Sequence, residues 1–334
     1  MEENLAIELT RYCDKACRHC GTDARYTRKF DETSMTFDTA RRILEDIIWT
    51  NKHRHMKKIR RVHLTGGEPF LWKEREHRVG DIVREVIGAG LTPQILTSGT
   101  TPRDKGFERY MEGFDSISDV PPFNVFHSFN LYMIGVSIID RSVYTIRLFD
   151  DLFSDKRDLG FYSIYDQENV QDTLKTFDQL MQGMGYKKIK RGATRNWEKL
   201  IEKGEHIFFV YSNRNRKAEC EFNPVDPCAG RAEIFKLKPV IINDECPISS
   251  KKKGILPVIS YMGDVHPCWF GPYPQTRPLG NIHEDHLSTI LRREKAYLGA
   301  FRAFISGNYD GNSDICGFCI GPAKEALKYQ FSKN

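Results

Sequence analysis

The chain has 334 residues and a formal net charge of +5, from 50 basic and 45 acidic side chains. Hydrophobic residues make up 40% and charged residues 28%, which is enough apolar material for a substantial core. No long uncharged apolar run is present and the first ten residues are acidic, so we expect no membrane segment and no signal or transit peptide. We therefore expect a cytoplasmic protein, whose nine cysteines are metal ligands or reactive thiols rather than disulfides.

Basic residues gather at 187–191, 214–217 and 251–253. Nucleic-acid binding would require aromatic side chains among these clusters or a recognisable module, and the sequence has neither. We interpret the clusters as solvated faces and expect no nucleic-acid partner.

Strand and helix patterns alternate along the first half of the chain. The predicted strands are residues 4–10, 60–65, 92–97 and 131–139, and the predicted helices are residues 37–51, 79–90 and 103–112. Alternation of this kind predicts parallel β/α units, and hence a barrel or an open α/β sheet.

Residues 140–205 are longer than one crossover requires. They contain helical patterns at 169–184 and 196–203, and we interpret them as a connection with an insertion that supplies substrate contacts. Two more strands, at 206–212 and 219–225, bring the candidate barrel strands to six.

The amino-acid composition changes after residue 236, where proline and glycine become frequent. The alternating stretch 254–270 predicts a hairpin that turns at Gly263 and Asp264. Helical patterns follow at 285–293, at 295–306 and from Pro322 onward. We predict two domains, residues 1–235 and 236–334.

Three cysteines, Cys13, Cys17 and Cys20, follow the first predicted strand in CxxxCxxC spacing. A structural zinc ion usually takes four protein ligands, and His19 lies too close to Cys20 to serve easily as the fourth. A [4Fe-4S] cluster with one open iron uses three thiolates naturally. The spacing therefore favours an iron–sulfur site.

A second motif, "HLTGGEPFL", ends the second predicted strand. Its glycines allow close backbone approach, and its glutamate can accept a hydrogen bond from an ammonium group. Together with the three cysteines, this motif resembles the radical S-adenosylmethionine (SAM) superfamily. The resemblance extends to "ILTSGT", "GVSII" and "NPVDPCAGRAEIF". It implies that the SAM contacts are His19, Gly66, Gly67, Glu68, Pro69, Thr97, Ser98, Ser137 and Arg231.

The fold implied by this resemblance is a partial (β/α)6 TIM barrel with its site at the C-terminal mouth of the strands. Two motifs depart from the family pattern. Ser98 stands where the family usually has asparagine, and Ile139-Asp140 stands where it often has Asp-Gly.

The remaining cysteines near the C-terminus resemble the Twitch domain, the shorter relative of SPASM, which holds one auxiliary [4Fe-4S] cluster. Four cysteines that end in CxxC also describe a zinc ribbon, and the N-terminal motifs favour iron–sulfur. The implied ligands are Cys246, Cys268, Cys316 and Cys319.

By resemblance, the first cluster reduces SAM to give a 5′-deoxyadenosyl radical that abstracts hydrogen from the substrate, with a flavodoxin- or ferredoxin-type protein as electron donor. Cys228 and Cys220 belong to neither ligand set, and either thiol could return a hydrogen atom and invert a stereocentre. The alternative is that both are small buried residues with a packing role and no part in catalysis.

We expect a radical SAM epimerase that acts on a ribosomally made peptide. The second hypothesis is epimerisation or dehydrogenation of an aminoglycoside, aminocyclitol or other carbohydrate, in which the auxiliary cluster takes an electron. A non-catalytic zinc-binding protein is the alternative from another class.

Overall fold

The structure is a computed structural model in which the chain divides into two compact units. Unit 1 comprises Met1–Gly67, Arg84–Thr92 and Pro227–Asn334, and unit 2 comprises Glu68–Val83 and Pro93–Asp226. The predicted domain boundary at residue 235 stays a prediction. The structure describes residues 3–15, 20, 24, 32–53, 58–99, 102, 105–121, 123–129, 136–152, 159–165, 170–189, 207–213, 216–224, 257–267 and 278–308.

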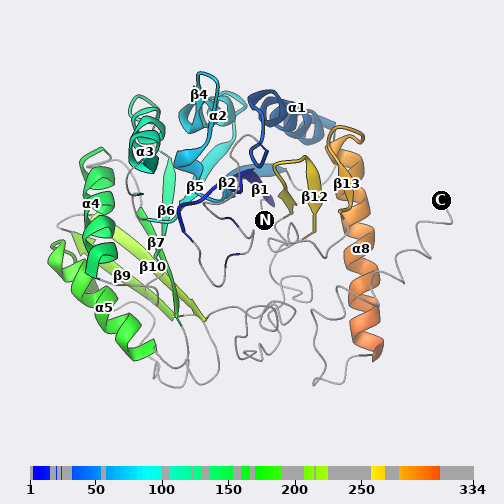
Figure 1. Cartoon of the computed structure of the whole chain (residues 1–334). Helices are drawn as coiled ribbons and strands as arrows, with labels where there is room; N and C mark the ends of the chain where they lie inside the picture. The colour runs from blue at the N-terminus through cyan, green and yellow to red at the C-terminus, as the bar shows by residue number, and fades with distance from the viewer. Residues whose placement is uncertain are drawn as a thin grey trace. The chain divides into compact units, whose positions relative to one another are not determined.

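Unit 1 is built on strands in the order β13-β12-β11-β1-β2 (Figure 1). Strand β1 pairs in parallel with both β2 and β11, whereas β11, β12 and β13 pair antiparallel. Residues Leu5 to Thr10 of β1 are all buried, as expected for a strand inside a parallel sheet. The elements are β1 (Glu3–Thr10), α1 (Phe37–His53), β2 (Ile59–Gly66), β11 (Val258–Ile259), β12 (Asp264–His266), β13 (Gly280–Asn281) and α8 (Leu287–Asn308).

Unit 2 has strands in the order β5-β6-β7-β10-β9-β8. The first four are parallel, and β9 and β8 continue the sheet antiparallel. Helix α2 (Val79–Gly88) begins in this unit and ends in unit 1. The other elements are η1 (Pro69–Leu71), β3 (Lys73–Glu74), β4 (His77–Arg78), β5 (Thr92–Thr97), α3 (Lys105–Asp115), β6 (Asn124–Phe129), α4 (Val136–Leu152), β7 (Leu159–Tyr165), α5 (Val170–Gly183), β8 (Lys187–Ile189), β9 (Ile207–Asn213) and β10 (Arg216–Pro224).

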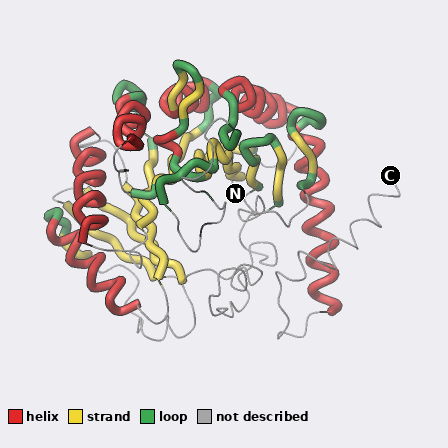
Figure 2. Tube along the Cα trace, viewed as in Figure 1, coloured by secondary structure: helices red, strands yellow, loops and turns green. Residues whose placement is uncertain are grey.

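Helices α4 and α5 cover one face of strands β7, β9 and β10 (Figure 2). The core between them includes Ile146 of α4, Phe177 of α5, Phe161 of β7 and Tyr211 of β9, all at most 1% exposed. The opposite positions of these strands therefore face away from the helices, since successive strand residues alternate.

Two sequence-based expectations for this region are wrong. Residues 136–139 form the first turn of α4, and the fourth strand is β6, seven residues earlier than predicted. A continuous apolar run does not by itself distinguish strand from helix, which explains the misplacement. The stretch expected to be an insertion contains β7, which lies between β6 and β10 as a regular strand of the sheet.

The C-terminal hairpin is confirmed, because β11 and β12 pair antiparallel around a turn in which Gly263 has a φ of +86°. The two helices expected at 285–293 and 295–306 are one continuous helix, α8. The strand predicted at 206–212 is β9, which runs antiparallel to β10. The helices predicted at 196–203 and from Pro322 lie outside the described residues.

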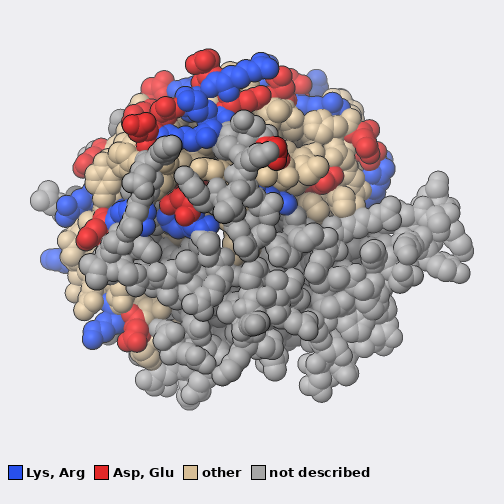
Figure 3. All heavy atoms as spheres, viewed as in Figure 1, with Lys and Arg blue, Asp and Glu red and all other residues tan. Residues whose placement is uncertain are grey.

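Among the described residues, no helix combines the length and the apolar character that crossing a bilayer would require. On the face drawn in Figure 3, basic and acidic side chains of the described residues lie interspersed. Residues 190–191, 214–215 and 251–253 of the three basic clusters lie outside the described residues, so the interpretation of these clusters as solvated faces stays a prediction.

Candidate functional site

The segment that carries the first cysteine leaves the sheet directly after β1. Cys13 is 6% exposed, and the sulfur of Cys20 accepts a hydrogen bond of 3.2 Å from the backbone N–H of Ala24. Cys17 and His19 lie outside the described residues. Amide N–H groups that donate to sulfur are typical of thiolates in iron–sulfur sites, so the described part of the motif fits the cluster predicted for it.

A short bridge fixes this segment in unit 1. The Thr10 and Ser34 hydroxyl oxygens lie 2.8 Å apart, and the Thr10 hydroxyl accepts a 2.9 Å bond from the Tyr12 N–H. The Arg11 N–H donates to the Thr33 carbonyl at 2.8 Å. The backbone entering Cys13 is therefore held at consecutive residues.

The glycine pair of the second motif packs against this same segment. Gly66 has a φ of +121°, and a Cβ there would lie 2.3 Å from the Thr10 carbonyl oxygen. A Cβ on Gly67 would lie 2.1 Å from the Tyr12 carbonyl oxygen, and the Gly67 N–H donates to the Thr10 carbonyl at 2.5 Å. In this structure the glycines thus make room for the backbone that leads to Cys13.

Glu68 belongs to unit 2, and its carboxylate is fully buried. It accepts hydrogen bonds from the Phe70 N–H at 3.2 Å, from the Thr97 hydroxyl at 2.9 and 3.1 Å, and from the Ser98 N–H at 2.7 Å. Burial raises the pKa of the Glu68 carboxyl group, and the hydrogen bonds from Ser98, Phe70 and Thr97 oppose this shift. The carboxylate therefore joins the end of β5 to the turn before η1.

Pro69, the last residue of the motif, opens the short helix η1, at a position where a missing N–H costs nothing. The next residue, Phe70, is fully buried, with ring centroids 5.3 Å from Tyr110 and 5.4 Å from Phe149. A Cβ on Gly113 of α3 would lie 2.2 Å from the Phe70 carbonyl oxygen. Close approach of α3 thus fixes the turn that carries Glu68.

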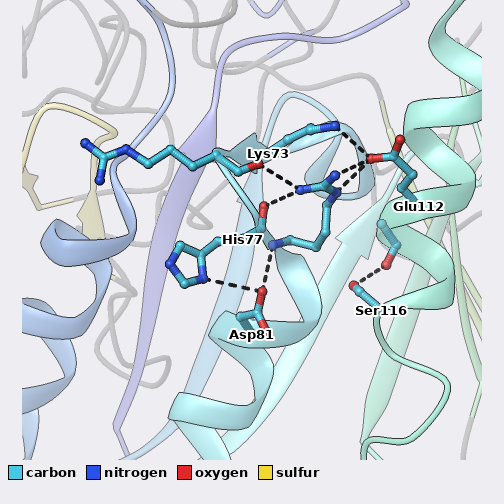
Figure 4. Close-up of polar contacts among 8 residues, drawn as sticks. Lys73, His77, Asp81, Glu112 and Ser116 are labelled. Carbon is cyan, nitrogen blue, oxygen red and sulfur yellow. Dashed lines mark hydrogen bonds and ion pairs between the residues drawn. The ribbon is translucent and has the colours of Figure 1, made fainter.

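A cluster of ions supports the next turn of the chain (Figure 4). Glu112 of α3 accepts hydrogen bonds from Lys73 at 3.0 Å and from Arg78 at 2.5 and 2.8 Å. Lys73 and Arg78 hold the pKa of the Glu112 carboxyl group below its usual range. These exposed contacts join β3 and β4 to α3, and we assign them a structural role.

Thr97 and Ser98, predicted as SAM contacts, both bind Glu68. Ser137 does not end a strand, because it lies in the first turn of α4, and that part of the expectation is wrong. The strand that takes this place, β6, carries a serine that no sequence pattern indicated. Ser128 is half-buried near the end of β6, and it follows His127, whose ring packs on Phe149 of α4. Ser128 is therefore on the opposite face from the helix core.

The two cysteines outside the ligand sets differ in what the structure describes. Cys220 is fully buried in the core formed with α4 and α5. Its neighbour Tyr211 is also buried there, and its hydroxyl donates to Asp178. This is the environment of a packing residue. Cys228 lies outside the described residues, as do Arg231 and the four cysteines of the C-terminal set: Cys246, Cys268, Cys316 and Cys319.

The hairpin that precedes Cys268 is described and lies in unit 1. Its β11 pairs with β1 at Ala6 and Ile7, so it is a direct neighbour of the strand that leads to Cys13. Burial lowers the pKa of His266 on β12 to about 4; Asp264 opposes this shift and Arg11 adds to it. His266 is therefore neutral at pH 7.

Two regions of the chain match known families. Residues 7–121 match the family described as the radical SAM superfamily. This part of the chain is therefore a radical SAM domain. Residues 254–320 match the SPASM family, described as an iron–sulfur cluster-binding domain, so iron–sulfur is favoured over zinc for the C-terminal cysteines. The cofactors implied by the two domains are SAM and [4Fe-4S] clusters. Of the four cysteines assigned to the second cluster, Cys246 lies before the matched range.

Solved structures of low sequence identity are also similar, and the one with a TM-score above 0.5 supports the fold. The crystal structure of Streptococcus suis SuiB is 14% identical, covers 91% of this chain and 68% of its own, and has a TM-score of 0.53. The structure of tagged anSMEcpe with bound AdoMet is 12% identical, covers 89% and 82%, and has a TM-score of 0.49. No curated protein sequence matches. The predicted α/β class with parallel strands is confirmed.

Proposed function

We propose that this radical SAM enzyme inverts a stereocentre in a residue of a ribosomally made peptide, with the thiol of Cys228 as hydrogen donor. The observation that carries the donor assignment is the burial of Cys220, which is 0% exposed inside the helix-packed core of unit 2. Of the nine cysteines, only Cys228 then remains outside both ligand sets and that core.

In this proposal, Cys13, Cys17 and Cys20 hold the first cluster, and the four C-terminal cysteines hold one auxiliary cluster. When bound, SAM and the first cluster supply a 5′-deoxyadenosyl radical that removes a hydrogen atom from the substrate. The chain orients these groups through the contact of Gly66 and Gly67 with the segment before Cys13. Within unit 2, Glu68 holds the Thr97–Ser98 strand end.

We assign the remaining SAM contacts to His19, Ser98 and Arg231, and we add Ser128 at the end of β6. Cys228 then returns a hydrogen atom to the opposite face of the substrate radical, which breaks its S–H bond and forms the new C–H bond. The resulting thiyl radical needs one electron and one proton before the next turnover. A flavodoxin- or ferredoxin-type protein supplies the electrons.

The second candidate is a two-electron oxidation of a carbohydrate alcohol. The match of residues 254–320 to an iron–sulfur cluster-binding domain favours it, because a second cluster is an electron acceptor. In that reaction no hydrogen atom returns to carbon, so a donor thiol is not required.

A matched pair of cysteine variants separates the two candidates. Full-length enzyme, purified anaerobically, is incubated with SAM, reductant and a peptide encoded beside its gene, in heavy water. An epimerase incorporates deuterium at the inverted carbon. Cys228→Ala still forms 5′-deoxyadenosine but gives no inverted product, whereas the control Cys220→Ala retains inversion. Oxidised product, or inversion that persists in Cys228→Ala, contradicts the donor proposal.

A further inference from the structure

Glu8 and Arg11 form an ion pair at the end of β1. The Arg11 Nε–H donates to the Glu8 carboxylate at 3.0 Å, and the two side chains are 16% and 0% exposed. An ion pair this deeply buried differs from a surface contact, because removal of one partner leaves an uncompensated charge inside the protein. Arg11 is two residues before Cys13.

The same pair reaches the C-terminal hairpin of unit 1. The Arg11 guanidinium lies over the Tyr261 ring, 5.1 Å from its centroid, in the distance range of a cation–π contact. The Glu8 carboxylate also accepts a long hydrogen bond, 3.4 Å, from the Tyr261 backbone N–H. Tyr261 stands in the turn between β11 and β12. Both ends of the ion pair therefore contact one residue about 250 positions away.

The strand pairing leaves this contact little freedom. Strand β11 pairs with β1 at Ala6↔Val258 and Ile7↔Ile259, so the ion pair begins where that ladder stops. Gly66 of β2 also packs closely against this ion pair, since a Cβ there would lie 3.0 Å from the Glu8 Cγ. The chain then continues from Arg11 to Cys13 on one side, and from β12 to Cys268 on the other.

We propose that Arg11 is a positioning residue: held between Glu8 and Tyr261, it locks the segment that carries Cys13 onto the hairpin that leads to Cys268. The inference rests on the proposed assignment of these cysteines to the two clusters. It joins the two metal-binding parts of the chain through one paired charge, which Glu8 neutralises in place.

Because the two side chains carry opposite charges, removing one or the other should change the midpoint potential of the first cluster in opposite directions, which a mere loss of structure would not do. Arg11→Met leaves the negative charge of Glu8, and Glu8→Gln leaves the positive charge of Arg11. Negative charge nearby disfavours the reduced cluster and positive charge favours it. The midpoint potential of the first cluster is therefore lower in Arg11→Met and higher in Glu8→Gln than in the wild type.

The experiment uses full-length enzyme with reconstituted clusters, under anaerobic conditions. Hydrogen exchange is followed in peptides that cover residues 257–267, and the cluster signal that responds to SAM is titrated by electron paramagnetic resonance. Arg11→Met accelerates exchange in 257–267 by about tenfold or more, which corresponds to about 1.4 kcal/mol of local stability. Arg11→Lys keeps the positive charge, so the midpoint potential of its first cluster stays near that of the wild type. Its exchange rate in residues 257–267 lies between those of the wild type and Arg11→Met.

Arg41→Met is the matched control, since it removes one positive charge from a half-exposed position on α1 in the same unit. Both readouts stay at wild-type values in this variant. If Arg11→Met does not fold, Tyr261→Leu removes the ring contact alone and still accelerates exchange in 257–267.

The lock is overturned if hydrogen exchange in residues 257–267 is as slow in Arg11→Met as in Arg41→Met. It is also overturned if the midpoint potential of the first cluster shifts in the same direction in Arg11→Met and Glu8→Gln. Neither readout requires turnover. An enzyme that lacks epimerase activity therefore still tests the lock, and an enzyme that inverts its peptide with an unchanged hairpin refutes the lock alone.

Discussion

The carboxylate of Glu68 accepts a 2.7 Å hydrogen bond from the backbone N–H of Ser98, thirty residues further along the chain. The Thr97 hydroxyl donates to both oxygens of the same carboxylate. One buried side chain thus fixes the end of β5 and the turn that precedes η1.

Thr97→Val removes a hydroxyl donor while keeping the shape of the side chain. We expect it to lower the free energy of unfolding by about 1–3 kcal/mol, because a buried carboxylate loses a partner that water cannot replace. Thr97→Ser keeps the hydroxyl and serves as the control, with a smaller loss. Urea titration at pH 7 measures both variants. Equal stability of Thr97→Val and Thr97→Ser would contradict the importance of this hydrogen bond.

Gly113→Ala tests the close approach of α3 to η1. The new methyl group would lie 2.2 Å from the Phe70 carbonyl oxygen, so helix or turn must shift, and we expect a loss of about 1–3 kcal/mol. Gly183→Ala is the control at the end of α5, where no atom beyond its chain neighbours and its own helix turn lies within 4 Å of the added carbon. A helical Gly-to-Ala change with free space is neutral or stabilising by up to about 1 kcal/mol. The midpoint temperature of thermal unfolding should therefore fall in Gly113→Ala and should rise or stay unchanged in Gly183→Ala.

Asp46 of α1 caps helix α8 from another part of unit 1. Its carboxylate accepts a 3.1 Å bond from the Leu287 N–H and lies 3.1 Å from the His286 ring nitrogen. Asp46→Ala leaves the first turn of α8 without this acceptor, and we expect it to cost about 1 kcal/mol. The exposed neighbour Glu45→Ala is the control. Faster hydrogen exchange near residue 287 in Asp46→Ala, but not in Glu45→Ala, is the expected result.

Elements with a clear local pattern could be predicted from the sequence. Helix α1 has regular apolar spacing, and the turn near Gly263 requires a left-handed residue, so both were found at nearly the right bounds. The boundary between β6 and α4 could not be predicted, because residues 123–149 contain apolar side chains compatible with either period. There the tertiary packing of Phe149 onto His127 favours the helix.

The candidate site likewise has features that the sequence predicts and features that it does not. Three cysteines and "GGEP" are contiguous motifs, so their family resemblance could be read directly. The role of Gly66 and Gly67 toward the backbone of Thr10 and Tyr12 is a tertiary contact that spacing alone does not reveal. The contact of Arg11 with Tyr261 could not be predicted from the sequence either, because an arginine and an aromatic residue far apart in the chain form no recognisable pattern.

His127 makes the stability of the protein depend on acid. It is fully buried against Phe149 and Phe161, and burial lowers its pKa from 6.5 to about 3. Above pH 6.5 neither the folded nor the unfolded chain protonates it, and the stability is fully present. As the pH falls from 6.5 toward 3, the unfolded chain binds a proton that the folded chain does not, so stability falls by up to about 1.4 kcal/mol per pH unit.

His127→Phe removes this proton uptake and should make the pH dependence of the unfolding free energy shallower between pH 6.5 and 4, while His63 and His266, whose pKa values burial also lowers to about 4, keep part of the slope. Phe177→Leu is the control, because its ring packs on Phe161 and Tyr211, so it lowers stability at every pH without acting on the His127 ring directly. Urea titrations at half-unit steps of pH measure both slopes. A His127→Phe variant that loses stability in acid as steeply as Phe177→Leu would show that other groups, and not this imidazole, carry the acid sensitivity.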